Sequence, residues 1–282
     1  MLKEYALKTI CFVNMKGGVA KTTLAINFAD CLRRVHGKKV ALIDIDPQFN
    51  ATQCLLNSAQ YIKHLQSGGD TILSLFDRDE SPQVSALAGS QSSPAKELSD
   101  IVLLDSAGLY LLPGNIDLYR VEMTSGEGRE FILKRYIDDV LAHDSYDYII
   151  IDTPPTPSIW MTSALIASDH YIIPVKPDPL SIIGIDLLKT IIARRTQAFG
   201  LTISCLGVVF TLIDRPDSVN LSTARSNLGQ NPVWRDKLIK AYLPKRTVYA
   251  REQLKSPFIL SGNDFELRES MKEMTNELIQ RL

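Results

Sequence analysis

The chain has 282 residues and a nearly balanced charge, with 31 Lys and Arg against 32 Asp and Glu and a formal net charge of −1. Hydrophobic residues make up 45% and charged residues 22%, which excludes wholesale disorder, a collagen-like chain and a disulfide scaffold. The length suits one large α/β domain or two small ones. Because no internal repeat and no second core-sized block is visible, we predict a single domain over residues 1–282.

The cysteine spacing and the hydropathy of the chain indicate in which cellular compartment the protein functions. The four cysteines lie far apart, form no CxxC pair and do not cluster with histidines, so we expect free thiols in a reducing cytosol. No apolar run approaches the ~20 residues of a membrane span. The first eight residues lack the apolar core of a signal peptide. We therefore expect a cytoplasmic protein without a membrane partner.

Apolar runs alternate with helical patterns in chain order. Residues 9–13 predict a buried strand, and a helix follows Gly18 and ends at Gly37. Further strands are predicted at 40–43, 148–151, 171–175 and 206–210, and stretches of helix length at 117–142, 158–168, 180–199 and 264–282. Continuous apolar strands alternating with helices favour an α/β fold: a mainly parallel, twisted sheet covered by helices on both faces.

Two segments interrupt this alternation. Residues 66–100 are rich in Ser, Gly, Pro and Asp, apart from a short helical piece near 72–76, and we predict a mobile surface insertion over 77–100. Residues 101–112 predict a hairpin, because two apolar runs flank a turn at Ser106-Ala107-Gly108.

A phosphate-binding loop is predicted between the first strand and the first helix. It reads Asn14-Met15-Lys16-Gly17-Gly18-Val19-Ala20-Lys21-Thr22-Thr23. The two glycines let the backbone curl so that its N–H groups point at a phosphate, and the helix N-terminus adds positive dipole. Lys21 would neutralise the β- and γ-phosphates of ATP, and the Thr22 hydroxyl would ligate Mg²⁺. The alternative is a chance glycine turn.

The loop departs from the strict pattern GxxxxGK[ST], because Met15 and Ala20 stand at its two glycine positions. It resembles instead the deviant Walker A box of the ParA/MinD family of ATPases, in which glycine usually stands at the position of Ala20. An alanine there demands an unstrained φ at that residue. We expect at worst slower or weaker nucleotide handling from this substitution.

Two further motifs place carboxylates at strand ends, where parallel sheets bind ligands. Asp44-Ile45-Asp46-Pro47-Gln48 matches the D-x-D-P-Q motif of the family, whose resemblance implies that Asp46 positions the attacking water and Asp44 lies near the Mg²⁺ shell. A turn cap is the alternative. Asp152 ends the strand 148–151 in a Walker B pattern and would hold Mg²⁺. Thr153-Pro154-Pro155 resembles the switch that responds to the γ-phosphate.

The resemblance covers about residues 8–260 and implies a complete nucleotide site. The residues expected to bind nucleotide are Lys16, Gly17, Gly18, Val19, Ala20, Lys21, Thr22, Thr23, Thr211 and Pro244, with Pro244-Lys245-Arg246 falling where family members contact adenine. Lys16, Lys21 and Asp46 are the expected catalytic residues. In the family, the lysine at position 16 reaches across a nucleotide-sandwich dimer to the phosphates of the partner; a solvated loop lysine is the alternative.

Basic residues are concentrated in one part of the chain. Between Lys189 and Lys255 there are twelve basic and four acidic residues, a local balance of 12 − 4 = +8. Such a stretch can bind DNA phosphates without reading sequence, with an affinity that falls as salt rises. ParA relatives bind non-specific DNA through this region, although solvated helix faces would show the same clustering. The residues expected to contact DNA are Arg194, Arg195, Arg215, Arg225, Lys245, Arg246 and Arg251.

The sequence favours a partition ATPase of the ParA type that lacks an N-terminal DNA-binding domain. Such a protein would form an ATP-bound homodimer, coat the nucleoid and position plasmid, chromosome or other cargo with a ParB-like partner. A MinD-like membrane regulator is the first alternative, but the helix expected at 264–282 carries five acidic against three basic residues and anionic lipid would repel it. The helix carries Phe265, Met271, Met274, Leu278 and Leu282 along one side and is expected to pack on the core.

Other relatives are less compatible with the residues. This chain lacks the cysteine ligands that iron–sulfur members of the family use to hold their cluster. A weakly hydrolysing, nucleotide-gated scaffold stays open because of Met15 and Ala20. A small-molecule ligase on the same fold, such as a relative of dethiobiotin synthetase, is disfavoured by the D-x-D-P-Q motif and by Lys16.

Overall fold

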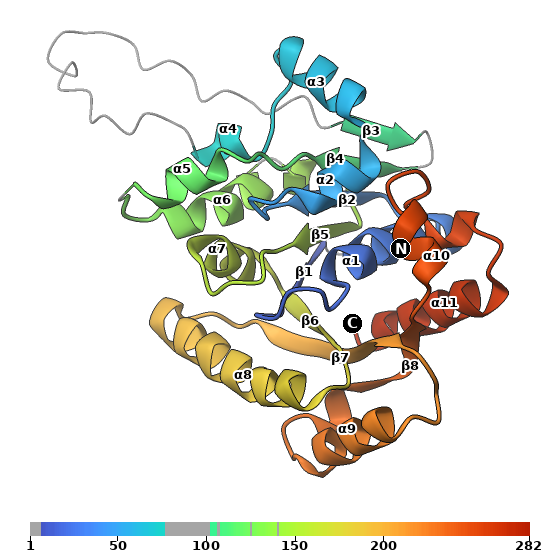
Figure 1. Cartoon of the computed structure of the whole chain (residues 1–282). Helices are drawn as coiled ribbons and strands as arrows, with labels where there is room; N and C mark the ends of the chain where they lie inside the picture. Colours follow the sequence, from blue (N-terminus) through green and yellow to red (C-terminus); the bar gives the residue numbers. More distant parts are fainter. Residues whose placement is uncertain (1–6, 77–101, 106–107, 125, 140) are drawn as a thin grey trace, which may run out of the picture.

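The computed structural model describes residues 7–76, 102–105, 108–124, 126–139 and 141–282 (Figure 1). The surface insertion predicted at 77–100 and part of the predicted hairpin turn lie outside these residues. Within them, no helix combines the length and the apolar character needed to cross a membrane.

A sheet of eight strands forms the middle of the molecule. The strands are β1 Lys8–Phe12, β2 Val40–Asp44, β3 Val102–Asp105, β4 Leu109–Leu112, β5 Tyr148–Asp152, β6 His170–Val175, β7 Ser204–Ile213 and β8 Leu238–Pro244. Their order is β3-β4-β2-β5-β1-β6-β7-β8. Six of the neighbouring pairs are parallel and β3 runs antiparallel to β4, which confirms the mainly parallel sheet and the two strands of the hairpin. The sequence pattern did not predict β8.

Helices follow most strands, as the alternating pattern predicted. They are α1 Lys21–His36, α2 Asn50–Leu55, α3 Ser58–Gln66, α4 Leu73–Phe76, α5 Leu118–Glu122, α6 Ile132–Asp139, α7 Ile159–Ala167, α8 Pro179–Phe199, α9 Val219–Gln230, α10 Thr247–Glu252 and α11 Phe265–Ile279. The stretch 117–142 was predicted to be of helix length. It divides instead into α5, a short 3-10 helix and α6, because the chain turns at Gly128 with φ of 75°.

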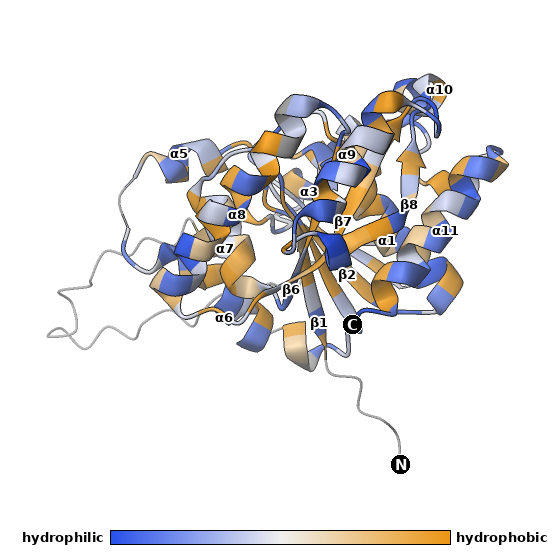
Figure 2. Cartoon of the chain, turned by 90° about the horizontal axis from the view of Figure 1, so that it is seen from below, coloured by the Kyte–Doolittle hydropathy of each residue, from blue (hydrophilic) through white to orange (hydrophobic). Residues whose placement is uncertain are grey.

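Helices lie on both faces of the sheet (Figure 2). Two buried clusters of side chains lie between the sheet and these helices, and neighbouring strand residues alternate between the clusters. In β1, Ile10 and Phe12 face the layer that contains α1 and α11, while Cys11 faces the layer that contains α6, α7 and α8. Side chains that alternate along a strand point to opposite faces, so strands buried on both sides need continuous apolar runs. This explains why the central strands could be predicted from the sequence.

Helix α11 packs against the sheet through Leu267, Met271, Met274 and Leu278, each no more than 4% exposed. Asp264 caps its first turn by accepting a hydrogen bond from the backbone N–H of Leu267. The expected packing of this helix on the core is therefore confirmed. The placement of Phe265 on its apolar side was wrong, because that side chain is 74% exposed at the start of the helix.

The carboxyl ends of the central strands meet at one edge of the sheet. Strand β5 lies between β2 and β1, and the register places Asp152 opposite both Asp44 and Phe12. The loop after β1, the acidic motif after β2 and the end of β5 are therefore neighbours, although Asp152 lies more than 100 residues after the acidic motif in sequence. Ligands bind at this edge in parallel α/β sheets.

Candidate functional site

Asn14 fixes the loop between β1 and α1 to β6, the strand beside β1 in the sheet. Its side-chain amide donates to the carbonyl of Pro174 at 2.6 Å, and its side-chain oxygen accepts from the backbone N–H of Lys16 at 2.9 Å. Both contacts hold the loop at the point where the chain leaves the sheet. At the other end, Gly18 takes a left-handed conformation with φ of 70°, which glycine adopts without strain. The loop thus curls as a phosphate cradle requires.

Ala20 ends the loop in a conformation that the sequence analysis did not expect. An unstrained φ was predicted there, but φ is 60° and ψ is 32°, in the left-handed region. This conformation is unfavourable for a residue with a Cβ by about 1 kcal/mol. Ala20 precedes the first turn of α1 and offers no side-chain cap to it. The ParA/MinD family, which this loop resembles, usually has glycine at this position. The left-handed conformation seen at Ala20 explains that preference.

Lys21 projects from the first turn of α1 toward the acidic strand ends. It is only 7% exposed, and its Nζ lies 3.4 Å from the backbone oxygen of Asn14. Burial lowers the pKa of Lys21, while Asp152 and Asp46 oppose that shift by favouring the charged amine. A buried lysine amid carboxylates at the mouth of a phosphate cradle can neutralise an incoming phosphate.

Asp152 is the most unusual group at this edge. It is fully buried, and neither carboxylate oxygen accepts a hydrogen bond from the described residues. Burial, opposed by Lys21, raises the pKa of Asp152 to about 7, and the Thr22 hydroxyl lies near enough to favour the charged form. A buried carboxylate without partners is costly unless a cation compensates it. An oxygen pair of this kind beside a threonine hydroxyl fits Mg²⁺, which prefers oxygen ligands.

Asp44, which is predicted to lie near the Mg²⁺ shell, stands opposite Asp152 in the register of β2 and β5. Its carboxylate is held by hydrogen bonds from the chain itself. Its Oδ2 accepts from the backbone N–H of Thr52 at 2.8 Å and from the Thr52 hydroxyl at 2.7 Å. The Thr52 oxygen in turn accepts from the N–H of Gly114 at 2.8 Å. Asp44 therefore joins α2 and the loop after β4 to the sheet.

Of the two carboxylates of this motif, Asp46 is the one that interacts electrostatically with Lys21. It is 4% exposed, and its Oδ1 accepts from the backbone N–H of Gln48 at 2.9 Å. Burial raises the pKa of Asp46, whereas the Gln48 hydrogen bond and Lys21 lower it. Immediately after the motif, Phe49 adopts φ of 39° and stacks on Tyr61 of α3 with ring centroids 5.5 Å apart. The motif is thus fixed on both sides.

The predicted second switch contacts β1, and one of the predicted adenine residues contacts the loop. The Thr153 hydroxyl donates to the carbonyl of Phe12 at 2.6 Å, and the Thr211 hydroxyl donates to the carbonyl of Val19 at 2.9 Å. Thr211 is fully buried, so in this arrangement it supports the phosphate loop. Pro244, at the end of β8, is paired in register with Ile213.

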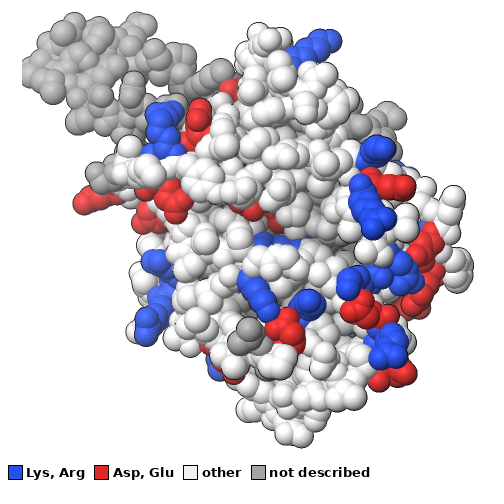
Figure 3. Space-filling model, in the orientation of Figure 1, with Lys and Arg blue, Asp and Glu red and all other residues white. Residues whose placement is uncertain are grey.

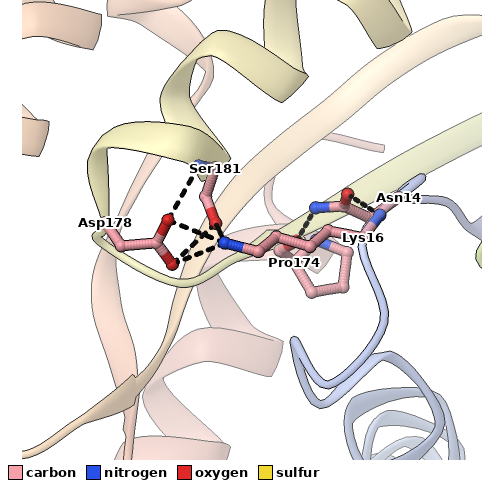
Figure 4. Close-up of polar contacts among 5 residues, drawn as sticks. All are labelled: Asn14, Lys16, Pro174, Asp178 and Ser181. Carbon is pink, nitrogen blue, oxygen red and sulfur yellow. Dashed lines mark hydrogen bonds and ion pairs between the residues drawn. The ribbon is translucent and has the colours of Figure 1, made fainter.

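Lys16 extends away from the phosphate cradle toward the start of α8 (Figure 4). Its Nζ donates to both carboxylate oxygens of Asp178, at 2.7 and 2.9 Å, and to the Ser181 hydroxyl at 3.0 Å. The lysine side chain is 39% exposed and that of Asp178 is 26% exposed. Lys16 is therefore neither a freely solvated loop lysine nor directed at its own phosphate loop.

The basic residues expected to bind DNA lie on several elements. Arg194 and Arg195 belong to α8, Arg225 to α9 and Arg251 to α10, while Arg215 follows β7 and Lys245 and Arg246 follow β8. Within the described residues, three of the seven have a hydrogen-bond or ion-pair partner: Arg246 pairs with Asp264 and Glu266, Lys245 pairs with Asp214, and Arg225 donates to the carbonyl of Lys240. On the face drawn in Figure 3, blue and red side chains alternate without merging into one continuous basic surface.

The sequence analysis missed the residues that fix the site. Thr52 and Gly114 carried no signal, because each acts through a hydrogen bond to a distant segment. Asp178 did carry one, because an acidic residue directly before a proline is typical of a helix start, whereas Ser181 carried none. In the structure Asp178 caps α8 and Pro179 begins it.

Comparisons with known proteins agree with this geometry. Residues 7–202 match a family model described as an AAA domain. The sporulation initiation inhibitor protein Soj of Bacillus subtilis is 31% identical over 247 residues, which cover 84% of each chain.

Solved structures share the fold along nearly the whole chain. A putative plasmid partition protein of Borrelia burgdorferi, bound to AMPPNP, has a TM-score of 0.77 at 20% identity and covers 98% of this chain and 99% of its own. Cobyrinic acid a,c-diamide synthase of Mycobacterium smegmatis, with a bound ATP analogue and magnesium, has a TM-score of 0.70 at 23% identity and covers 97% and 95%. The same fold therefore occurs in proteins with different names and activities.

Proposed function

The chain belongs to the ParA/MinD family of P-loop ATPases, and from this premise we propose that it is a slow, Mg²⁺-dependent ATP hydrolase that acts in partition. The observation that supports this best is the meeting of Lys21, Asp46 and Asp152 at one edge of the sheet, beside the curled loop 14–20. These groups supply a phosphate cradle, a water-positioning carboxylate and a cation ligand, which hydrolysis of a phosphoanhydride requires.

Each residue has a distinct role in the proposed reaction. Backbone N–H groups of 17–21 hold the phosphates, and Lys21 neutralises the charge that develops on them. Thr22 and Asp152 would hold Mg²⁺, which would polarise the terminal phosphate when bound. Asp46 orients the attacking water and stays anchored through the N–H of Gln48. Hydrolysis is slow until a partner is bound.

The proposed active form is a homodimer closed face to face around ATP. In that form Lys16 of each protomer reaches the phosphates of the other and stabilises charge in the transition state, as an arginine finger does. Lys16 lies on the rim of the cradle with a side chain 39% exposed, so a second protomer has access to it.

The ATP dimer is proposed to bind non-specific DNA and to associate with the nucleoid in the cytoplasm. A ParB-like partner attached to plasmid, chromosome or other cargo stimulates hydrolysis and releases the dimer. The exposed residues Arg194, Arg215 and Arg251 suit DNA contacts best, because no hydrogen bond or ion pair engages them within the described part of the chain.

Two alternatives give different results in simple assays. A MinD-like membrane regulator needs a free amphipathic helix, whereas the apolar residues of α11 are buried against the sheet. A weakly hydrolysing, nucleotide-gated scaffold is favoured by the strained Ala20. Liposome binding with ATP tests the first alternative, and single-turnover hydrolysis with DNA and partner present tests the second.

The central experiment compares DNA binding with ATP and with ADP over a salt series. We expect binding with ATP and Mg²⁺ only, independent of sequence and weakening steeply as salt rises. ATP turnover is measured in parallel on the same samples. Equal DNA binding with ADP, or no turnover in the presence of Mg²⁺, DNA and a partner, would overturn the proposal.

A further inference from the structure

The ammonium group of Lys16 is fully engaged within its own chain (Figure 4). Its three N–H donors meet three acceptors, namely both carboxylate oxygens of Asp178 and the Ser181 hydroxyl, at 2.7 to 3.0 Å. Asp178 is the N-cap of α8 and Ser181 lies in its first turn, 162 and 165 residues further along the chain than Lys16. A lysine held in this way cannot at the same time contact phosphates of another protomer.

Asp178 is also held in place by contacts that do not involve Lys16. Asp178 caps α8, and its carboxylate accepts from the backbone N–H of Ser181 at 2.9 Å and from the Ser181 hydroxyl at 2.9 Å. Ser181 is 2% exposed, so its side chain has little freedom. Partial burial raises the pKa of Asp178, but the hydrogen bonds from Lys16 and Ser181 outweigh it, so the carboxylate stays ionised at neutral pH. The positive end of the helix dipole also favours the anion.

We propose that Asp178, supported by Ser181, is a positioning residue that holds Lys16 inside its own protomer and must release it before two protomers close around ATP. The proposal rests on the trans role of Lys16 stated above. The Lys16–Asp178 ion pair then acts as a latch, and its strength sets the protein concentration at which the ATP-bound chain dimerises.

The expected size of the effect follows from the exposure of the pair. Partly exposed ion pairs change an equilibrium constant by up to about fivefold. Because a symmetric dimer requires both protomers to release Lys16, the effect is squared and reaches about 25-fold at most. A change of about tenfold in the dimerisation constant is therefore the reasonable expectation, and it should shrink as salt screens the pair in the parent chain.

Asp178→Asn and Asp178→Ser test the latch without removing the helix cap, because Asn and Ser are both favourable N-cap residues. The full chain is loaded with AMPPNP and Mg²⁺, and its dimerisation is followed by sedimentation velocity over a range of concentrations. Both variants should dimerise at about tenfold lower concentration than the parent. Asp138→Asn is the matched control, since it removes the same charge from the exposed Lys134–Asp138 pair on α6 and should change nothing.

A second measurement does not depend on dimerisation. The amine of Lys16 is acetylated in the nucleotide-free chain and the modified peptide is followed by mass spectrometry. The variants should label Lys16 several-fold faster than the parent, with Lys38 as an internal reference. Unchanged labelling, or unchanged or weaker dimerisation of the variants, overturns the latch. If Lys16 is labelled faster in the variants than in the parent, but the parent never dimerises with AMPPNP, the proposed function is contradicted. The Lys16–Asp178 contact is still supported in that case.

Discussion

Asp44 and Asp152 lie directly opposite each other on the neighbouring strands β2 and β5, and both carboxylates are fully buried. Only one of them is satisfied by the protein. Asp44 accepts two hydrogen bonds from Thr52, whereas the oxygens of Asp152 accept none from the described residues. Burial and the neighbouring Asp152 raise the pKa of Asp44 well above its ordinary value. A cation bound to Asp152 would relieve the repulsion between the two carboxylates. This explains why the carboxylate of Asp152 has no hydrogen-bond partner among the described residues.

The first prediction concerns the pH dependence of stability in the absence of Mg²⁺ and nucleotide. Burial, opposed by Lys21, raises the pKa of Asp152 from its unfolded value near 3.8 to about 7. The folded state therefore binds this proton more tightly than the unfolded state between pH 4 and 7, and its contribution to the free energy of unfolding falls as pH rises through that window. The loss is of order 4 kcal/mol.

Asp152→Asn removes this titration, so its free energy of unfolding should depend less on pH than that of the parent. Urea unfolding at pH 5 and pH 7.5 measures the difference. Mg²⁺ should stabilise the parent with bound ADP and not the variant. Parallel pH profiles for the two proteins would contradict the assignment.

The second prediction concerns the strained Ala20. Replacing it with glycine should raise the free energy of unfolding by about 1 kcal/mol, because glycine adopts a φ of 60° without strain. Thermal or urea unfolding measures the change. Ala193→Gly, at an exposed position inside α8, is the control and should lower stability by about the same amount. A destabilised Ala20→Gly variant would show that Ala20 is not strained.

The third prediction concerns Asp46. Asp46→Ala should leave ATP binding intact and abolish turnover, so the ATP-bound dimer accumulates. Size exclusion with ATP and Mg²⁺ detects the dimer, and phosphate release measures turnover. Asp138→Asn again serves as a charge control with normal turnover. If Asp46→Ala hydrolyses ATP at the parent rate, another group positions the water.

The fourth prediction concerns Lys16 itself. Lys16→Ala should still bind ATP as a monomer, because Lys21 and the loop backbone hold the phosphates, but it should neither dimerise nor hydrolyse ATP. Fluorescent-nucleotide binding and sedimentation separate these two effects. Dimerisation or normal turnover of this variant would exclude the trans role.

The fifth prediction concerns the support of the phosphate loop by Thr211. Its buried hydroxyl donates to the carbonyl of Val19, and Thr211→Val leaves that carbonyl without its partner at a cost of about 1–3 kcal/mol. Nucleotide affinity should fall by about tenfold. Thr211→Ser keeps the hydroxyl and should bind nearly as the parent does. Calorimetric titration with ADP measures both variants, and an unchanged affinity in Thr211→Val would place Thr211 outside the support of the loop.

Much of the fold could be read from local patterns. The central strands are continuous apolar runs because both their faces are buried, and the phosphate loop is identified by glycines between a strand and a helix. Strand β8 was not predicted because Lys240 interrupts its apolar run, at the outermost strand of the sheet. The stretch 117–142 was read as of helix length because its breaks depend on a turn at Gly128.

The sequence by itself determined which chemical groups the protein has: the glycine loop, Lys21, Thr22 and the strand-end carboxylates, since each is encoded within a few neighbouring residues. Only the tertiary structure decided which of those groups are available. Thr52 satisfies Asp44, Asp178 holds Lys16 and Asp264 pairs with Arg246, whereas Asp152 keeps its oxygens for a cation. The nearly balanced net charge could not reveal this, because pairing depends on distances between segments that the chain brings together only on folding.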